Sequence, residues 1–183
     1  MSTPAVPAPL AQLPNALTLG RLAIIPVFVA LMVQAGDAPS WPAGILFGIA
    51  GVTDQIDGFL ARLWHVESRF GKIADPLADR MMIDAAVILL VVYGRLPWAG
   101  LVVIAARDVL LLTGWRVLAP RGIDIEVNLL GKAATWVLYA AIGFRIVTHD
   151  STSWPLWLFW IGLAGAVAAA MLYVRDAWKV MER

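Results

Sequence analysis

Two stretches of this sequence decide its fold and its chemistry. They read Asp-Gln-Ile-Asp-Gly-Phe-Leu-Ala-Arg at residues 54–62 and Gly-Lys-Ile-Ala-Asp-Pro-Leu-Ala-Asp at residues 71–79. Each stretch holds two carboxylates within otherwise apolar sequence, namely Asp54, Asp57, Asp75 and Asp79. Residues three or four positions apart share one face of a helix, so each stretch would present its two carboxylates together. The sequence therefore predicts two helical pairs of acids.

The segment between the two stretches indicates how the pairs meet. Residues 65–72 are polar and suit the turn of a helical hairpin, which would bring the two pairs face to face. Four carboxylates that converge at low dielectric repel one another unless cations neutralise them. An oxygen-only ligand set suits hard divalent ions such as Mg²⁺, Mn²⁺ or Ca²⁺, and does not suit zinc. We therefore predict a metal site at this hairpin.

The composition indicates an all-α, polytopic membrane protein. Of the 183 residues, 61% are hydrophobic and 15% are charged, whereas soluble domains average about 45–50% apolar and about 25% charged residues. The absence of cysteine excludes disulfides, thiolate metal ligands and a cysteine nucleophile. Residues 1–13 are too rich in proline for a long helix and are predicted to form a flexible tail. Residues 14–183 are predicted to form one six-helix domain.

Six apolar segments have about the length that crosses a bilayer. The first is not followed by a small-residue cleavage site, so it is expected to be retained as a span. Turn and capping residues separate the segments, with Ser40 as the cap of the second and Pro76 in the first turn of the third. The predicted spans are residues 15–35, 40–64, 74–93, 97–118, 128–147 and 154–180.

Basic residues predict the orientation of the six spans. Those expected on one side are Arg62, Arg69, Lys72, Arg116, Arg121, Lys132, Arg175, Lys179 and Arg183. The opposite side has essentially Arg95 and Arg145. The positive-inside rule places the basic side in the cytoplasm, together with both termini and the open end of the aspartate cluster. We expect an integral protein of a bacterial inner or plasma membrane.

Eight positions over 26 residues resemble the signature of the CDP-alcohol phosphatidyltransferases. They follow the pattern Asp-x2-Asp-Gly-x2-Ala-Arg-x8-Gly-x3-Asp-x3-Asp and are Asp54, Asp57, Gly58, Ala61, Arg62, Gly71, Asp75 and Asp79. Residues 13–21, 106–112 and 131–135 are similar to the branch of phosphatidylglycerophosphate synthases and eukaryotic-type cardiolipin synthases. The resemblance implies an enzyme that moves a phosphatidyl group from CDP-diacylglycerol to an alcohol and releases CMP.

The resemblance also implies a role for each signature position. The four aspartates would surround two divalent cations, Mg²⁺ or Mn²⁺, and Asp79 would also take the proton of the acceptor hydroxyl. The CDP portion would be lined by Gly58, Ala61, Arg62 and Gly71. Membrane lipids are the implied surroundings, a homodimer is an expected assembly, and no nucleic acid is expected as a partner.

The acceptor alcohol is left open by the sequence. Three cations near the cytoplasmic half, Arg107, Arg116 and Lys132, could hold a phosphate on glycerol 3-phosphate or phosphatidylglycerol. Alternatively, they only set the topology, with Arg107 paired to Asp108. Arg-Asp at 107–108, where the resemblance leads us to expect Arg-Glu in glycerophosphate enzymes, slightly favours a cardiolipin synthase. An inositol-phosphate or serine transferase is the alternative within the family.

A transporter is the main alternative outside this class of enzyme, because carboxylates within membrane spans also mark ion paths. An ion-coupled transporter would distribute its charges through the membrane depth and would repeat a broken helix in two related halves. Here the acids gather in one hairpin, and no internal repeat is visible. The sequence therefore favours the enzyme.

Overall fold

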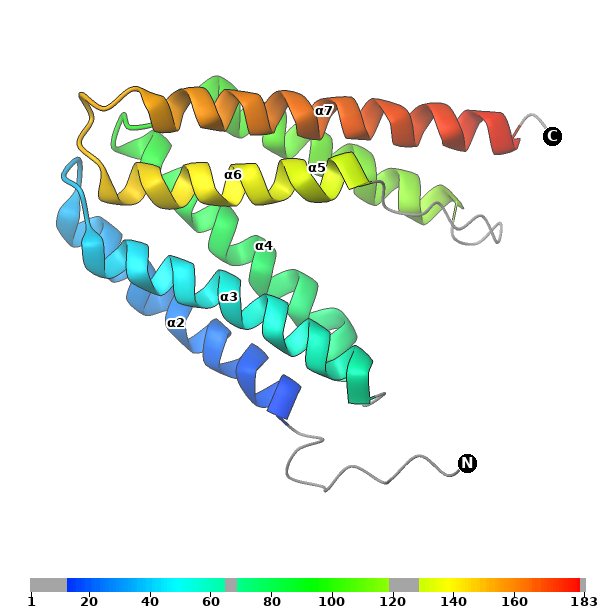
Figure 1. Cartoon of the computed structure of the whole chain (residues 1–183), viewed down its shortest axis with the longest axis horizontal. Coiled ribbons are helices and arrows are strands. Elements are labelled where there is room, and N and C mark those ends of the chain that lie inside the picture. Colours follow the sequence, from blue (N-terminus) through cyan, green and yellow to red (C-terminus); the bar gives the residue numbers. More distant parts are fainter. Residues whose placement is uncertain (1–12, 65–68, 119–128, 182–183) are drawn as a thin grey trace. The chain divides into compact units, whose positions relative to one another are not determined.

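The computed structural model describes residues 13–64, 69–118 and 129–181, and it describes side chains for residues 19–53, 80–110, 113–114 and 129–175. The described ranges form six helices and contain no strand (Figure 1). The helices are α2 (Leu13–Ala35), α3 (Trp41–Trp64), α4 (Arg69–Val92), α5 (Trp98–Leu118), α6 (Leu129–Val147) and α7 (Trp154–Met181). The predicted all-α class is confirmed for this part of the chain.

Five helices follow the predicted spans to within a few residues, whereas the start of α4 was predicted wrongly. The helix begins at Arg69 rather than near residue 74, so part of the predicted turn is helical. Pro76 consequently lies inside α4 and not in its first turn. Proline fixes φ near −65°, which is a helical value, so the helix can continue through it at the cost of one backbone hydrogen bond and of a clash between its ring and the carbonyl four residues earlier. The predicted tail lies outside the described residues, apart from Leu13, which begins α2, and so does Asn128, the first residue of the fifth predicted span.

The chain divides into two compact units, residues 1–89 and residues 90–183. We call these the first unit and the second unit. The division falls within α4, between Leu89 and Leu90. The first unit contains α2, α3 and most of α4, and the second contains α5, α6 and α7.

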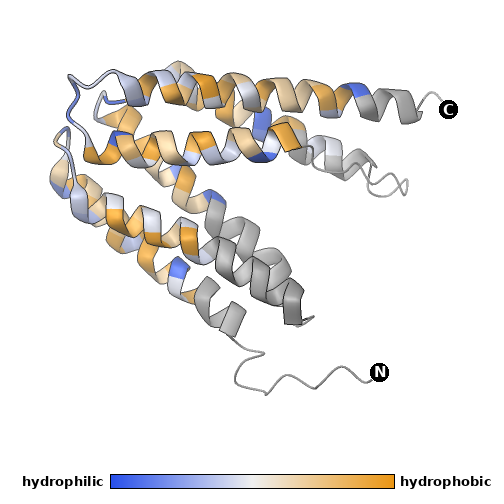
Figure 2. Ribbon diagram, in the orientation of Figure 1, coloured by the Kyte–Doolittle hydropathy of each residue, from blue (hydrophilic) through white to orange (hydrophobic). Residues whose placement is uncertain are grey.

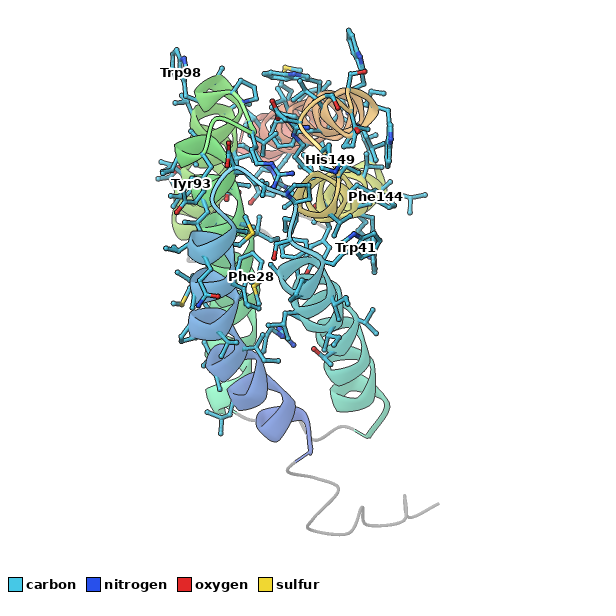
Figure 3. The ribbon with its side chains drawn as sticks, turned by 90° about the vertical axis from the view of Figure 1, so that its left-hand side faces the viewer. Phe28, Trp41, Tyr93, Trp98, Phe144 and His149 are labelled. Atoms are coloured by element: carbon cyan, nitrogen blue, oxygen red, sulfur yellow. The ribbon has the colours of Figure 1, made fainter. Side chains whose placement is uncertain are left out.

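In the first unit, α2 and α3 form a tight antiparallel hairpin (Figure 1). Gly36 ends α2 with φ of 61°, a left-handed conformation that glycine adopts without steric cost. The buried Ser40 caps α3, as predicted, because its hydroxyl oxygen accepts a hydrogen bond from the Ala43 amide at 3.3 Å. The rings of Phe28 and Phe47 meet across the hairpin with centroids 5.9 Å apart, and Figure 3 shows Phe28 between the two helices.

The second unit begins with a Schellman turn at the end of α4. Gly94 has φ of 70°, and its amide donates to the Val91 carbonyl at 3.0 Å. The Arg95 amide donates to the Leu90 carbonyl at 2.7 Å, which completes the motif. This turn directs the chain into α5, in agreement with the predicted break between the span that ends at residue 93 and the span that begins at residue 97.

Two buried arginines join this turn to the end of α6. The Arg95 guanidinium donates to the carbonyls of Arg145 and Thr148, each at 2.5 Å. Arg145 donates from Nε to the Arg95 carbonyl at 2.6 Å and pairs with the Asp150 carboxylate. Because the last carbonyls of a helix have no partner within that helix, Arg95 supplies donors that α6 itself lacks. These two residues, which the sequence offered only as topology markers, are buried structural links.

Small residues let α7 pack closely on α6. A Cβ atom built on Gly162 would lie 2.9 Å from the Leu138 amide nitrogen and 3.1 Å from a methyl group of Val137. One built on Gly165 would lie 3.2 Å from Cβ of Ala134. Such close approach between apolar helices requires glycine or alanine at the contact. Figure 1 shows the two helices side by side along most of their lengths.

We expect Gly162→Ala to lower the stability of the protein by about 1–3 kcal/mol, the usual range for overpacking. The added methyl group would press on backbone of α6, which cannot rotate away as a side chain can. Gly48→Ala on α3 is the matched control, because a Cβ there meets nothing within 4 Å. It should leave stability unchanged or raise it slightly, since alanine favours helix over glycine. Thermal unfolding of both variants in detergent checks this, and equal melting temperatures would contradict it.

Two of the described helices are long and apolar enough to cross a membrane, at residues Leu129–Val147 and Trp154–Arg175. Figure 2 shows hydrophobic residues along much of the visible face of α6 and α7, with hydrophilic residues in the loop that joins them. Large apolar side chains on the surface of α7 include Trp157 and Ile161, which are 69% and 64% exposed. Shorter apolar stretches occupy Leu19–Ala35 and Trp41–Thr53. A surface of this kind suits lipid better than water.

Candidate active site

The first half of the aspartate motif lies on the last third of α3. Residues 54–62 are helical, so Asp54 and Asp57 are three positions apart on one helix, as predicted. The same stretch carries the predicted CDP-binding positions Gly58, Ala61 and Arg62. The side chains of this stretch lie outside those that the structure describes.

The second half of the motif lies on the first half of α4. Gly71, Asp75 and Asp79 are all within this helix, and the two aspartates are four positions apart. Residues 65–68, which join α3 to α4, lie outside the described residues, as do the side chains of 69–79. The helical placement of both aspartate pairs is therefore confirmed, whereas their meeting across a hairpin stays a prediction.

The donor set of the motif fits a divalent metal centre. Among the side chains that the structure describes, no group of three or more His, Cys, Asp or Glu could hold a metal ion, and the four motif aspartates are not among those side chains. Two helices of one unit nevertheless supply four carboxylates at spacings that share a helix face. Carboxylate oxygens are the ligands that Mg²⁺ and Mn²⁺ prefer.

Arg107 and Asp108, on α5 in the second unit, form an ion pair. Nη1 of Arg107 lies 3.3 Å from Oδ1 of Asp108, and the two side chains are 20% and 16% exposed. The pairing that the sequence offered as an alternative to acceptor binding is thus present. Nε of Arg107 is buried and makes no hydrogen bond within the described part of the chain. A partly paired guanidinium with a spare donor could still bind an anion.

The other two predicted acceptor cations also belong to the second unit. Arg116 lies on α5, nine residues beyond Arg107, with its side chain outside those described. Lys132 is the fourth residue of α6, and its side chain is exposed. Within the described side chains, Lys132 makes no hydrogen bond and no ion pair. The exposed ammonium of Lys132 is open to a ligand.

Arg21 was given no role by the sequence analysis, yet it is one of the most buried side chains in the first unit. Its side chain is 2% exposed, and it lies on α2 seven residues before Phe28. The signal available in the sequence was a basic residue at helical spacing from apolar residues in an otherwise apolar span. That pattern alone does not distinguish a buried arginine from one at the membrane surface.

Comparison with known proteins decides the family. The family model for CDP-alcohol phosphatidyltransferases matches residues 11–171. The chain belongs to this family. The matched range contains all eight signature positions and the three candidate acceptor cations. This member is therefore a phosphatidyltransferase.

Curated relatives agree over almost the whole chain. A protein of Bacillus subtilis is 32% identical over 93% of this chain and 97% of its own length. Proteins of Escherichia coli K12 and Shigella boydii are each 28% identical, over 93% of this chain and 92% of their own. All three are named CDP-diacylglycerol–glycerol-3-phosphate 3-phosphatidyltransferase.

These similarities support a transferase of phospholipid biosynthesis that is associated with the membrane. They also agree with the two apolar helices of the second unit. The ion-coupled transporter, which carboxylates within the predicted spans also allowed, is not supported, because the family match covers the helices that carry those carboxylates.

Proposed function

We propose that this phosphatidyltransferase uses glycerol 3-phosphate as its acceptor and forms phosphatidylglycerophosphate and CMP from CDP-diacylglycerol. The observation that carries the proposal is that relatives named for this activity align over 93% of the chain. Asp108 had slightly favoured a cardiolipin synthase, in which phosphatidylglycerol is the acceptor. The named relatives favour the smaller acceptor, so phosphatidylglycerol becomes the alternative to be tested.

The proposed reaction is one displacement at phosphorus. The acceptor hydroxyl oxygen forms a bond to the phosphorus that carries the diacylglycerol, the bond from that phosphorus to the bridging oxygen breaks, and CMP leaves with the electron pair. Asp79 accepts the hydroxyl proton. Asp54, Asp57, Asp75 and Asp79 are the proposed holders of two Mg²⁺ or Mn²⁺ ions. When bound, such ions neutralise the pyrophosphate and the developing charge on the leaving group.

The remaining signature positions are proposed to bind the CDP portion. Gly58 and Gly71 lack side chains, which permits close approach of the nucleotide to the helix backbone. Ala61 is nearly as small and lies one turn after Gly58 on α3. Arg62 can hold phosphate oxygens through two parallel hydrogen bonds. The helical spacing of Gly58, Ala61 and Arg62 supports this division, because it places them along one side of α3.

The test is product analysis with purified protein. CDP-diacylglycerol and Mg²⁺ are supplied with glycerol 3-phosphate, phosphatidylglycerol, inositol phosphate or serine, and both CMP release and lipid mass are measured. We expect rapid CMP release and phosphatidylglycerophosphate with glycerol 3-phosphate alone. Cardiolipin formed from phosphatidylglycerol at a higher kcat/KM would replace the proposed acceptor. Absence of CMP release with every acceptor would overturn the proposed function.

The architecture that we propose around this site has six membrane spans, formed by the six described helices. We further propose one functional domain over residues 14–183, with a flexible tail before it, in a bacterial inner membrane. The family match over residues 11–171 supports the single domain. The distribution of basic residues supports placing both termini and the active site in the cytoplasm. A homodimer stays a prediction, which the mass of the purified protein in a nanodisc can check.

Labelling of introduced cysteines checks the topology without background, because the chain has no native cysteine. Cysteines placed at Asp37 and His149, both exposed in the loops after α2 and α6, should react with an impermeant maleimide added to intact cells. Cysteines at His65 and Arg121 should react only after the cells are opened. External labelling at position 65 would invert the proposed orientation.

A further inference from the structure

Arg21 carries a buried charge to which the proposed mechanism assigns no role. Its side chain is 2% exposed, although it lies in an apolar helix of the first unit. A guanidinium does not lose its proton in a protein. Removing such a charge from water is costly unless an anionic or strongly polar group faces it. A group that accepts hydrogen bonds must therefore lie within reach of the Arg21 guanidinium.

The hairpin of α2 and α3 shows which residues face each other. The contact between Phe28 and Phe47 fixes the register of the two antiparallel helices. The buried residues on α2 are Arg21, Ile25, Phe28 and Met32, and those described on α3 are Ala43, Phe47 and Ala50. About one helical turn from the phenylalanine pair toward the loop, Met32 on α2 lies at the same level as Ala43 on α3. About one turn away from the loop, Ile25 lies at the same level as Ala50.

The same matching of residues across the antiparallel hairpin can be extended one step further from the loop. Two helical turns before Phe28 is Arg21, and two helical turns after Phe47 is Asp54. Seven residues return to nearly the same face of a helix, so both positions continue the stripes that meet in the hairpin. Asp54 is the first carboxylate of the signature and lies on the helical part of α3.

We infer that Arg21 is a positioning residue that holds the Asp54 carboxylate through charge-assisted hydrogen bonds. The inference rests on the proposed function, because it gives Arg21 a task at the same site. Burial of Arg21 argues for contact with a protein carboxylate rather than with substrate. A bidentate guanidinium fixes the plane of a carboxylate, and groups that orient metal ligands in this way contribute about 10- to 100-fold to affinity or activity.

Cross-linking tests the register without any catalysis. Cysteines at positions 21 and 54 should be joined by a short bifunctional thiol cross-linker, as should a pair at 28 and 47, because both pairs face each other in the register that the Phe28–Phe47 contact indicates. The matched control pairs Ala23 with Val52, which are both exposed on the hairpin surface. Equal cross-linking of the 21/54 and control pairs, with strong cross-linking of 28/47, would overturn the register on which the inference depends.

Stability measured in EDTA tests the contact itself. Arg21→Gln and Asp54→Asn should each lower the melting temperature, because each leaves one charge of the pair without its partner. The double variant should lose clearly less than the two single losses combined. Additive losses would show that Arg21 is held by a different group, and would overturn the inference whether or not the protein transfers phosphatidyl groups.

Kinetics separate positioning from simple structural support. At a temperature where all variants are folded, Arg21→Gln should lower kcat at least tenfold and leave KM for both substrates within about threefold. Arg21→Lys should recover only part of kcat, since an ammonium lacks the bidentate fork. Arg95→Gln is the matched control, because it also removes a buried guanidinium but one bonded to carbonyls in the second unit, and it should retain kcat. An Arg21→Gln variant with unchanged kcat would contradict the positioning role.

Discussion

Asp57→Asn and Asp75→Asn are each expected to lower kcat for CMP release by roughly 10³-fold, equivalent to about 4 kcal/mol of transition-state stabilisation. One aspartate lies on α3 and the other on α4, so the pair of variants tests both halves of the proposed metal centre. Asparagine keeps the shape of the side chain and removes its charge, which weakens binding of a hard cation. Chelation should abolish transfer in the same way, with recovery on addition of Mg²⁺ or Mn²⁺ and poor recovery with zinc.

These variants should remain folded. Neutralising an aspartate inside a membrane segment lowers its insertion cost, which is about 2.5–3.5 kcal/mol for the charged form. Asp37→Asn is the matched control, because Asp37 is exposed in the loop between α2 and α3. It should keep full activity, and circular dichroism should show the same helix content in all three variants. Undiminished transfer in excess EDTA would contradict the metal centre.

Arg116→Gln and Lys132→Gln should each raise the KM for glycerol 3-phosphate about 10- to 100-fold, with little change in the KM for CDP-diacylglycerol. A lost hydrogen bond to a charged group is worth about 1.5–3 kcal/mol, which sets this range. The exposed Lys132 side chain is the simplest case, since the described structure gives it no ion pair whose loss could disturb the fold. Initial rates of CMP release, with each substrate varied in turn, measure both constants.

Arg107 needs a different design because it is paired with Asp108 at 3.3 Å. Arg107→Gln would remove this ion pair from the largely buried carboxylate of Asp108, so the melting temperature of the variant must be measured before its kinetics. The double variant Arg107→Gln with Asp108→Asn removes that complication and should still show the raised KM. Arg175→Gln, at an exposed position on α7, is the control expected to keep both constants. Unchanged acceptor KM in all folded variants would exclude a phosphate-bearing acceptor.

Local patterns in the sequence were sufficient for most of the secondary structure. Apolar segments flanked by turn residues predicted α2, α3, α5, α6 and α7, and Ser40 caps α3 as expected. Helix formation depends on neighbours within about four residues, which is why such patterns are informative. The start of α4 was missed because a proline ordinarily indicates a first turn, whereas here five further residues before the predicted start are helical.

The motif on α3 and α4 was also readable from the sequence alone. Its chemistry resides in the types and spacing of its residues, and the family match confirmed the class of enzyme that they imply. The identity of the acceptor alcohol could not be predicted in this way. Arginine and lysine residues serve equally as phosphate-binding groups, ion-pair partners and topology markers. The similarity to named relatives, rather than the pattern around Arg107, supports glycerol 3-phosphate.

By itself, the sequence determined the all-helical class, most of the helix boundaries and the carboxylate motif, since each of these depends on residues that are close along the chain. Only the tertiary structure decided that Arg21 is buried, that Arg107 pairs with Asp108, and that Arg95 supplies hydrogen bonds to the end of α6. The physical reason is that a long cationic side chain has no fixed neighbours in the sequence. Its partner is set by the register of helices packed around it, and that register follows from contacts such as the one between Phe28 and Phe47.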